Sequence, residues 1–238
     1  THSINQVAAG RKWNQGDIVI TSDREHNSNL VPWLQLKDKG VELRTVPSLE
    51  DNTFDLEAYE EACADAGTNL KLVSLVHVGN LDGVEIPIAA ASKIAHDHGA
   101  IMHVDGAQSA PHIPIDIESL GCDLFSFSIH KMLGPTGVGA LWGKQEILST
   151  LEPISAGGGT VSSADSRGYS LRPIPDRLEG GLGNYAGICG TEAALDLLSQ
   201  YNMHDFATQE IRINEIITQG IKDLPGVEII GPTDASKR

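Results

Sequence analysis

The sequence is poor in positive charge, in cysteine and in long apolar runs, and each shortage excludes a class of protein. Lys and Arg number 17 against 32 Asp and Glu, a formal net charge of −15, which argues against nucleic acid or an anionic membrane as a partner. No apolar run is long enough to span a bilayer. The 3 cysteines show neither metal-site spacing nor a disulfide framework. A reducing cytoplasm is therefore the expected compartment.

The cysteines are predicted to be structural. Cys63 falls within a helical pattern, Cys122 opens an apolar strand, and Cys189 lies in a later helical pattern. A buried thiol has a raised pKa and is inert, so we expect none of the three to be reactive.

Strand and helix patterns alternate over the first 130 residues, and hydrophobic residues make up 40% of the chain. This alternation predicts an α/β domain built from parallel strands with right-handed crossovers. The predicted strands are Asp17–Ser22, Val41–Val46, Leu70–Val78, Ala100–Asp105 and Cys122–His130, with Gly137–Trp142 as an antiparallel neighbour of the last. The predicted helices are Thr1–Gly10, a segment capped by Ser28 that runs to Leu36, Leu56–Ala66 and Ile86–His98.

The pattern changes after residue 150. Residues Ser155–Gly183 are rich in Gly, Ser and Pro and show no periodicity, so we expect a long functional loop over the sheet. Two helices, Tyr185–Tyr201 and Asp205–Asp223, are predicted next. The apolar run Val227–Ile230 predicts the start of a further strand.

Polar side chains occur where four of the predicted strands end. Each of them has a structural explanation when taken alone, as a surface histidine, a turn former, a helix cap or a core hydroxyl. The carboxyl ends of parallel strands meet at one edge, where open α/β sheets bind ligands. We therefore expect these side chains to lie together: His26, Asn80, Asp105, Gln108, Ser128, His130 and Lys131.

This set meets the chemical demands of pyridoxal phosphate. A lysine at a strand end can be desolvated and form a Schiff base, and Lys131 can supply it. The cofactor needs a carboxylate at its ring nitrogen, for which Asp105 is the candidate. His26 can lie flat over the ring, and Gln108 and Asn80 can donate hydrogen bonds to the phenolic oxygen.

The phosphate of such a cofactor needs hydroxyl groups, a cation and a helix N-terminus. Ser128 and His130 can supply the first two, beside the lysine. The first predicted helix, Thr1–Gly10, reads as one whose start is cut off, and its Thr1 end is a further candidate.

Three segments resemble the class V aminotransferase family. They are Glu25–Trp33 (EHNSNLVPW), Val104–Gln108 (VDGAQ) and Ser128–Gly139 (SIHKMLGPTGVG). The nearest likeness is to the SufS-type cysteine desulfurases and selenocysteine lyases, and it runs from Thr1 to about Gly190. The resemblance implies the large domain of a fold-type-I pyridoxal phosphate enzyme, with helices on both faces of the sheet.

The resemblance also implies an activity and a set of roles. The activity is conversion of L-cysteine to L-alanine, with enzyme-bound sulfur passed on for iron–sulfur cluster assembly, in a homodimer that delivers sulfur to an acceptor scaffold protein. Lys131 would bond to the cofactor, His26 stack on the ring, Asp105 face the pyridine nitrogen and Gln108 face the phenolic oxygen. Thr1, Ser128 and His130 would hold the phosphate.

The sequence departs from the family pattern at several positions. His2 stands where glutamate is common, and Leu182 replaces a threonine whose hydroxyl reaches the neighbouring subunit's phosphate. We place a large domain at residues 1–204 and the incomplete start of a smaller one at 205–238. The sulfur-accepting cysteine and the arginine for the substrate carboxylate are expected outside this chain, which by itself is then expected to hold the cofactor weakly and to lack turnover.

Other functions stay open at the level of sequence. The same fold supports amino transfer, epimerisation and selenocysteine lysis. A metal site is a distant alternative, because His96, His98, His103 and Asp105 lie close in sequence. A third alternative is a non-catalytic doubly wound domain, since a fold does not imply a function.

Overall fold

A six-stranded sheet with the strand order β2-β1-β3-β4-β5-β6 forms the centre of the molecule. The structure is a computed structural model that describes residues 1–238. The first five strands pair in parallel, and β6 pairs antiparallel to β5. The strands are β1 (Ile18–Ser22), β2 (Glu42–Val46), β3 (Leu70–Val76), β4 (Ile101–Asp105), β5 (Leu124–Ser128) and β6 (Gly139–Gly143). The predicted strands are thus confirmed, with five parallel strands followed by an antiparallel sixth.

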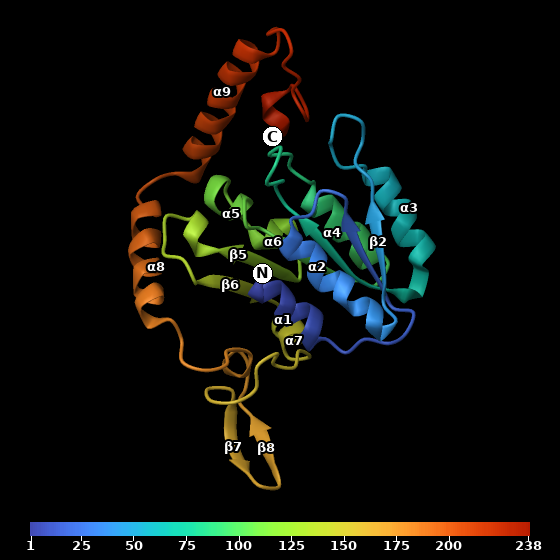
Figure 1. Ribbon diagram of the computed structural model, residues 1–238, viewed down its shortest axis with the longest axis vertical. Coiled ribbons are helices and arrows are strands. Elements are labelled where there is room, and N and C mark those ends of the chain that lie inside the picture. Colours follow the sequence, from blue (N-terminus) through green and yellow to red (C-terminus); the bar gives the residue numbers. More distant parts are fainter.

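Helices cover both faces of this sheet (Figure 1). They are α1 (His2–Gly10), α2 (Asn27–Leu34), α3 (Leu56–Ala66), α4 (Ile88–Asp97), α5 (Ser109–His112), α6 (Ile117–Leu120), α7 (Gln145–Leu148), α8 (Tyr185–Leu198) and α9 (Met203–Ile221). Short 3-10 turns follow several of them, and one, η3 (Ile129–Lys131), directly follows β5. The crossovers therefore wrap both sides of the parallel strands, as the α/β pattern predicts.

Two hydrophobic clusters, one on each face, hold these helices to the sheet. On one face α1 buries Ile4 and α2 buries Trp33 against Leu72 of β3. On the other face α3 buries Tyr59 in the cluster that contains Val73. Neighbouring residues of a strand point to opposite faces, so the continuous apolar run of β3 serves both clusters.

The segment predicted as a loop contains a hairpin. Strands β7 (Val161–Asp165) and β8 (Gly168–Leu171) pair antiparallel in a separate two-stranded sheet, which projects from the end of the molecule opposite α9 (Figure 1). Most of its side chains are exposed, so no alternation of buried and exposed residues marks it in the sequence. The expectation of a long loop over the sheet is wrong for this part of Ser155–Gly183, which forms a hairpin that projects away from the sheet.

The C-terminal region also differs from its prediction. Residues Val227–Ile230 form no strand and pair with no neighbour. Gly226 has a left-handed φ of 78°, which turns the chain out of α9's direction. The chain ends in a 3-10 turn, η5 (Ala235–Lys237), that returns to α9, where the Asn214 side chain donates to the Arg238 carbonyl at 3.2 Å. The domain boundary at residue 204 stays a prediction.

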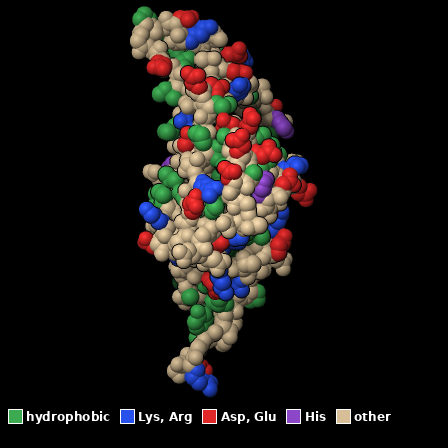
Figure 2. Space-filling model, turned by 90° about the vertical axis from the view of Figure 1, so that its right-hand side faces the viewer, with side chains coloured by type: hydrophobic (Ala, Val, Ile, Leu, Met, Phe, Trp, Pro, Cys, Tyr) green, Lys and Arg blue, Asp and Glu red, His purple; other side chains and the backbone are tan.

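The surface reflects the composition. Figure 2 shows acidic side chains spread over one face, most densely in its upper half, toward the end that carries α9. No helix combines the length and the apolar character needed to cross a membrane.

Gly106, which follows β4, has no room for a side chain. A Cβ there would overlap the ring of Phe125, and the Gly106 amide donates to the Ser126 carbonyl at 2.8 Å. We expect Gly106→Ala to lower the free energy of unfolding by about 1–3 kcal/mol, the usual cost of overpacking. Urea denaturation followed by circular dichroism measures it.

Gly220 is the matched control for this prediction. It lies in α9, and a Cβ there meets nothing within 4 Å. Gly220→Ala should leave stability unchanged or raise it by up to about 1 kcal/mol, because alanine favours a helix more than glycine does. Equal stability of the Gly106→Ala variant and the wild type would contradict the packing argument.

Candidate active site

A pocket of about 230 Å³ lies at the carboxyl edge of the sheet, where β3, β4 and β5 end. The side chains that line it come from the ends of these three strands and the turns after them, from the turn after β1, and from the starts of α1 and α2. They include all eight residues predicted from the sequence: Thr1, His26, Asn80, Asp105, Gln108, Ser128, His130 and Lys131. The pocket is also lined by Ser3, Ile4, Ser28, Val76, Ala107, Ser126 and Phe127, which the prediction did not include.

Lys131 is placed by a tight turn rather than by the strand itself. The strand β5 ends at Ser128, so the expectation of a strand to His130 is wrong. The Ile129 amide donates to the Val138 carbonyl at 3.2 Å, and the Ile129 carbonyl accepts from the Gly134 amide at 3.1 Å. The buried Ile129 side chain anchors this turn, which leaves the half-buried Lys131 facing the pocket.

Asp105 is the buried acid of the pocket. The residue ends β4 and is only 4% exposed. Burial raises the pKa of its carboxyl group, although the Ala107 amide, which donates to Oδ1 at 3.0 Å, and the nearby Lys131 and His26 lower it. A buried carboxylate with one short hydrogen bond is stabilised by any cationic group that enters the pocket.

The first turns of α1 and α2 meet at the edge of the pocket. The helix α2 begins after His26, whose Nδ1 accepts a hydrogen bond from the Ser28 amide at 3.1 Å. His26, and not the predicted Ser28, is therefore the cap. The Ser28 hydroxyl lies 2.6 Å from the Thr1 hydroxyl, which precedes α1. Two hydroxyl groups and a helix N-terminus thus occupy one corner.

Glu25 fixes the turn that carries His26. Its Oε1 accepts from the Ser22 hydroxyl at 2.7 Å and from the Val76 amide at 3.0 Å, and its Oε2 accepts from the Asn29 side chain at 2.6 Å. Burial of the carboxyl group raises the pKa of Glu25 to about 7, despite these hydrogen bonds. The sequence reading missed this role, because the three partners come from separate elements.

A chain of neutral hydrogen bonds continues from Asn29 beneath the pocket. Its Oδ1 accepts from the Ser74 hydroxyl at 2.5 Å, and Ser74 Oγ lies 2.8 Å from His103 Nδ1. His103 Nε2 lies 2.9 Å from the Ser126 hydroxyl. Burial lowers the pKa of His103 to about 3, so this imidazole stays neutral.

The histidines of the alternative metal site do not come together in the structure. His103 belongs to the buried chain, whereas His96 contacts Asp123 at 2.8 Å and His98 Nδ1 lies 2.9 Å from the Ile94 carbonyl. No group of three or more His, Cys, Asp or Glu side chains converges in a metal-binding arrangement.

The cysteines lie away from the lining of the pocket. Cys63 and Cys122 are buried, and burial raises the pKa of each thiol to about 11. Cys189 is exposed on α8, so the prediction that it is inert through burial is wrong. Leu182, which stands where the family pattern has a threonine, is 90% exposed.

The groups present suit pyridoxal phosphate. The pocket offers an amine, a buried carboxylate and an imidazole for the ring, and hydroxyl groups beside a helix N-terminus for the phosphate. The burial of Asp105, 4% exposed with one hydrogen bond from the Ala107 amide, is the observation that tests this fit, because a protonated pyridine nitrogen would supply the cation that this carboxylate lacks.

The pH dependence of stability should report Glu25. A group whose pKa is raised by folding favours the folded state below its unfolded pKa, here 4.5, and this contribution is lost as pH rises through about 7. We expect the urea midpoint of the wild type to fall between pH 5 and pH 8 more steeply than that of Glu25→Gln. Parallel curves for the two proteins would contradict the assignment, and Glu118→Gln, a change at an exposed helix start, serves as the control.

Comparisons with known proteins show which family and which solved structures the chain is similar to. Residues 1–238 match the model of the family described as Aminotransferase class-V. A Halalkalibacterium halodurans protein named "Probable cysteine desulfurase" is 38% identical over 236 residues, which cover 98% of this chain and 57% of that protein. The structure of the cysteine desulfurase CsdA (S-sulfonic acid) from Escherichia coli has a TM-score of 0.90 at 32% identity, covering 98% of this chain and 59% of that one.

A second solved structure, the apo cysteine desulfurase from Thermococcus onnurineus NA1, has a TM-score of 0.92 at 33% identity and covers 99% of this chain. The chain spans only 59% of that protein. The predicted fold is confirmed by these superpositions. Because the family match covers the whole sequence and its relatives exceed 30% identity, the chain belongs to the class V aminotransferase family.

Proposed function

We propose that this chain forms the cofactor-binding part of a pyridoxal-phosphate-dependent cysteine desulfurase. The reaction takes L-cysteine and an acceptor thiol to L-alanine and a persulfide: the C–S bond of cysteine breaks, an S–S bond forms, and a proton replaces sulfur on carbon. One observation carries the proposal. A lysine, a buried carboxylate and an imidazole line the same pocket in a chain whose relatives are named as cysteine desulfurases.

Asp105 holds the ring nitrogen in this proposal. Bound pyridoxal phosphate supplies an electron sink for charge that develops at the α-carbon of an amino acid, and a protonated ring nitrogen strengthens it. The buried carboxylate of Asp105 favours that proton, since burial leaves it in need of a cationic partner.

Lys131 and His26 line the pocket that would hold the cofactor. The Lys131 amine would hold the cofactor through its aldehyde group, and the same amine could move a proton at the α-carbon of the substrate. The His26 ring is held by its own hydrogen bond to the Ser28 amide, so the imidazole has a fixed orientation for stacking. Gln108 and Asn80 line the same pocket and would donate amide hydrogens to the phenolic oxygen.

The corner formed by α1 and α2 binds the phosphate. Thr1 and Ser28 offer hydroxyl groups 2.6 Å apart, and Ser128 and His130 line the same pocket. The amide groups at the start of α1 add the favourable end of the helix dipole. Sequence reasoning assigned this role to Thr1, Ser128 and His130, and Ser28 joins them here.

Sulfur transfer requires a thiol that can reach the substrate. Cys63 and Cys122 do not qualify, because both are buried with raised pKa values.

We extend the proposal to a homodimer in the cytoplasm that delivers sulfur to a scaffold protein for iron–sulfur cluster assembly. Exposed apolar side chains such as Leu133 and Tyr185, 69% and 66% exposed, support a second subunit.

Borohydride reduction should fix the cofactor on Lys131. We expect label in the peptide that contains Lys131, and loss of both label and yellow colour in Lys131→Ala, because Lys131 is the only lysine that lines the pocket. Peptide mass mapping makes the measurement. Lys93→Ala, at an exposed lysine paired with Asp97, is the control. Label on a different lysine would reject the assignment.

Removal of the Asp105 carboxylate should separate binding from turnover. Made in the whole protein, Asp105→Ala should keep part of its cofactor and lose roughly a hundredfold or more in alanine and sulfide release, the range typical of a group that controls a proton in the transition state. Asp116→Ala, at an exposed helix cap, should leave turnover unchanged. Near-normal turnover of Asp105→Ala would remove the proposed role.

A further inference from the structure

Two loops that carry opposite walls of the candidate site face each other across a second cleft. One follows β1 and ends at His26, and the other follows β3 and contains Asn80. They line a cleft of about 320 Å³. No backbone hydrogen bond joins residues 23–26 to residues 79–82, so side chains must set the distance between the loops.

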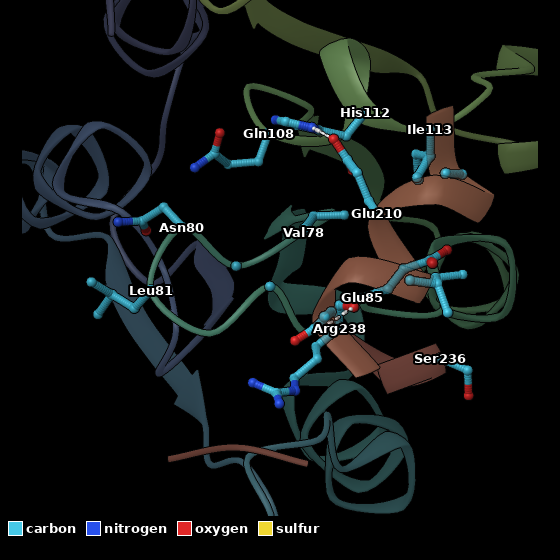
Figure 3. Close-up of a pocket in the computed structure, with 15 residues that line it drawn as sticks. Val78, Asn80, Leu81, Glu85, Gln108, His112, Ile113, Glu210, Ser236 and Arg238 are labelled. Carbon is cyan, nitrogen blue, oxygen red and sulfur yellow. Dashed lines mark hydrogen bonds and ion pairs between the residues drawn. The ribbon is translucent and has the colours of Figure 1, made fainter. Parts of the chain in front are cut away.

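The base of the Asn80 loop is closed by backbone hydrogen bonds, from the Gly79 amide to the Val84 carbonyl at 2.9 Å and from the Gly83 amide to the Gly79 carbonyl at 3.0 Å. The tip of the loop has little packing support. Leu81 is 91% exposed. Asn80 borders the candidate site on one side and a pocket of about 360 Å³ on the other, where it lies opposite α9 (Figure 3). A loop with open space on both sides needs a specific contact to hold one position.

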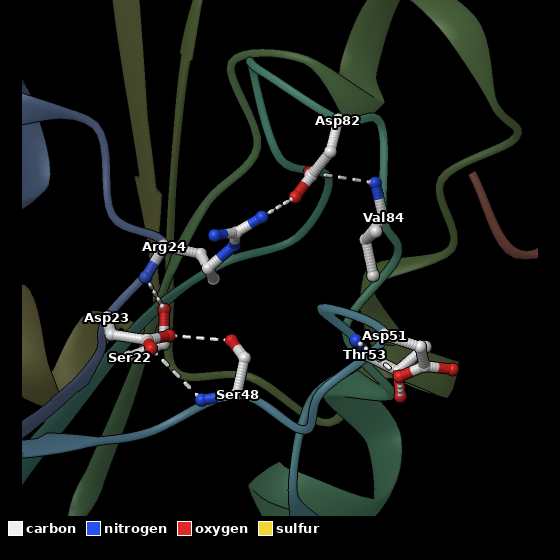
Figure 4. A network of polar contacts seen from close by, with 8 residues as sticks. All are labelled: Ser22, Asp23, Arg24, Ser48, Asp51, Thr53, Asp82 and Val84. Atoms are coloured by element: carbon white, nitrogen blue, oxygen red, sulfur yellow. Dashed lines mark hydrogen bonds and ion pairs between the residues drawn. The ribbon is translucent and has the colours of Figure 1, made fainter. Parts of the chain in front are cut away.

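Arg24 and Asp82 supply that contact. The Arg24 guanidinium donates to Asp82 Oδ2 across the gap between the loops (Figure 4). The Asp82 side chain is 4% exposed and that of Arg24 is 27% exposed. The second oxygen of Asp82 accepts from the Val84 amide at 3.2 Å. A carboxylate this buried depends on its cation, because removal of one partner leaves an uncompensated charge.

The surroundings of the pair are built to hold both ends. A Cβ on Gly79 would overlap Asp82 Oδ1, so glycine leaves the space that the carboxylate occupies. On the other loop the Asp23 carboxylate accepts from the Ser48 hydroxyl at 2.6 Å and from the Ser48 amide at 3.0 Å. The Arg24 amide donates to the Ser22 hydroxyl at 3.2 Å. Hydrogen bonds therefore hold the backbone of the Arg24 loop, and the salt bridge ties the Asn80 loop to it.

We propose that Arg24 and Asp82 are positioning residues that set the spacing of His26 and Asn80, and with it the width of the cofactor pocket. Neither residue lines that pocket. They act through the loops, by holding the ring-stacking group and the phenolic-oxygen donor at a fixed separation. This inference rests on the proposed function for the roles of His26 and Asn80.

A double-mutant cycle on cofactor affinity tests the proposal. The dissociation constant for pyridoxal phosphate is measured by absorbance titration for the wild type, Arg24→Met, Asp82→Leu and the double variant. Each single variant should bind roughly tenfold more weakly, and the double variant should lose no more than either single one, because both changes break one contact. Arg24→Lys, which keeps the charge, should recover most of the affinity. Arg167→Met, at an exposed pair with Asp165, should change nothing.

Hydrogen exchange on the cofactor-free protein gives a second measurement. Exchange in residues 79–84 should quicken in Arg24→Met while exchange in β4 stays unchanged, because the loop opens and the core does not. Wild-type affinity in both single variants, or additive losses in the double variant, would overturn the inference. If the wild type binds no pyridoxal phosphate, the proposed function is overturned. Hydrogen exchange then tests the role of Arg24 and Asp82 independently, and unchanged exchange of residues 79–84 in Arg24→Met would reject that role.

Discussion

The parallel register of the central strands is the constraint on which the candidate site depends. Val76 at the end of β3 pairs with Asp105 at the end of β4, and Asp105 pairs with Ser126 of β5. The ends of three strands therefore reach the same edge together, and the polar residues of the turns that follow lie along it. Because side chains alternate between faces, a slip of one residue in β4 would turn Asp105 away from Lys131 and toward the opposite hydrophobic cluster.

The same register arranges the face beneath the pocket in layers. Leu72 and Ile101 pair at its base, within the hydrophobic cluster, and Ser74 pairs with His103 one layer above. The carboxylate of Asp105 stands above this polar layer. The middle layer is hydrogen-bonded and neutral, which satisfies its buried polar atoms and keeps added charge away from the acid above it.

The central sheet and the edge that carries the candidate site could be predicted from the sequence, whereas several contacts at that edge could not, for physical reasons. Strand runs and turn signals are local, so the elements that deliver Asp105 and Lys131 could be predicted. The turn at Ile129 could not, because its amide pairs with Val138, which lies beyond the turn. The roles of Glu25 and of the Arg24–Asp82 contact could not be predicted for the same reason, since their partners lie up to 58 residues away in the sequence. The exposed hairpin carries no hydrophobic alternation to read.

That hairpin has a consequence for how the molecule opens. The strands β7 and β8 pair only with each other, and nearly all their side chains face solvent. A two-stranded ribbon without a hydrophobic face is marginally stable in water. The hairpin can therefore unfold and refold locally without disturbing either hydrophobic cluster that holds helices to the sheet. A protease that needs an extended substrate would cleave the chain there first.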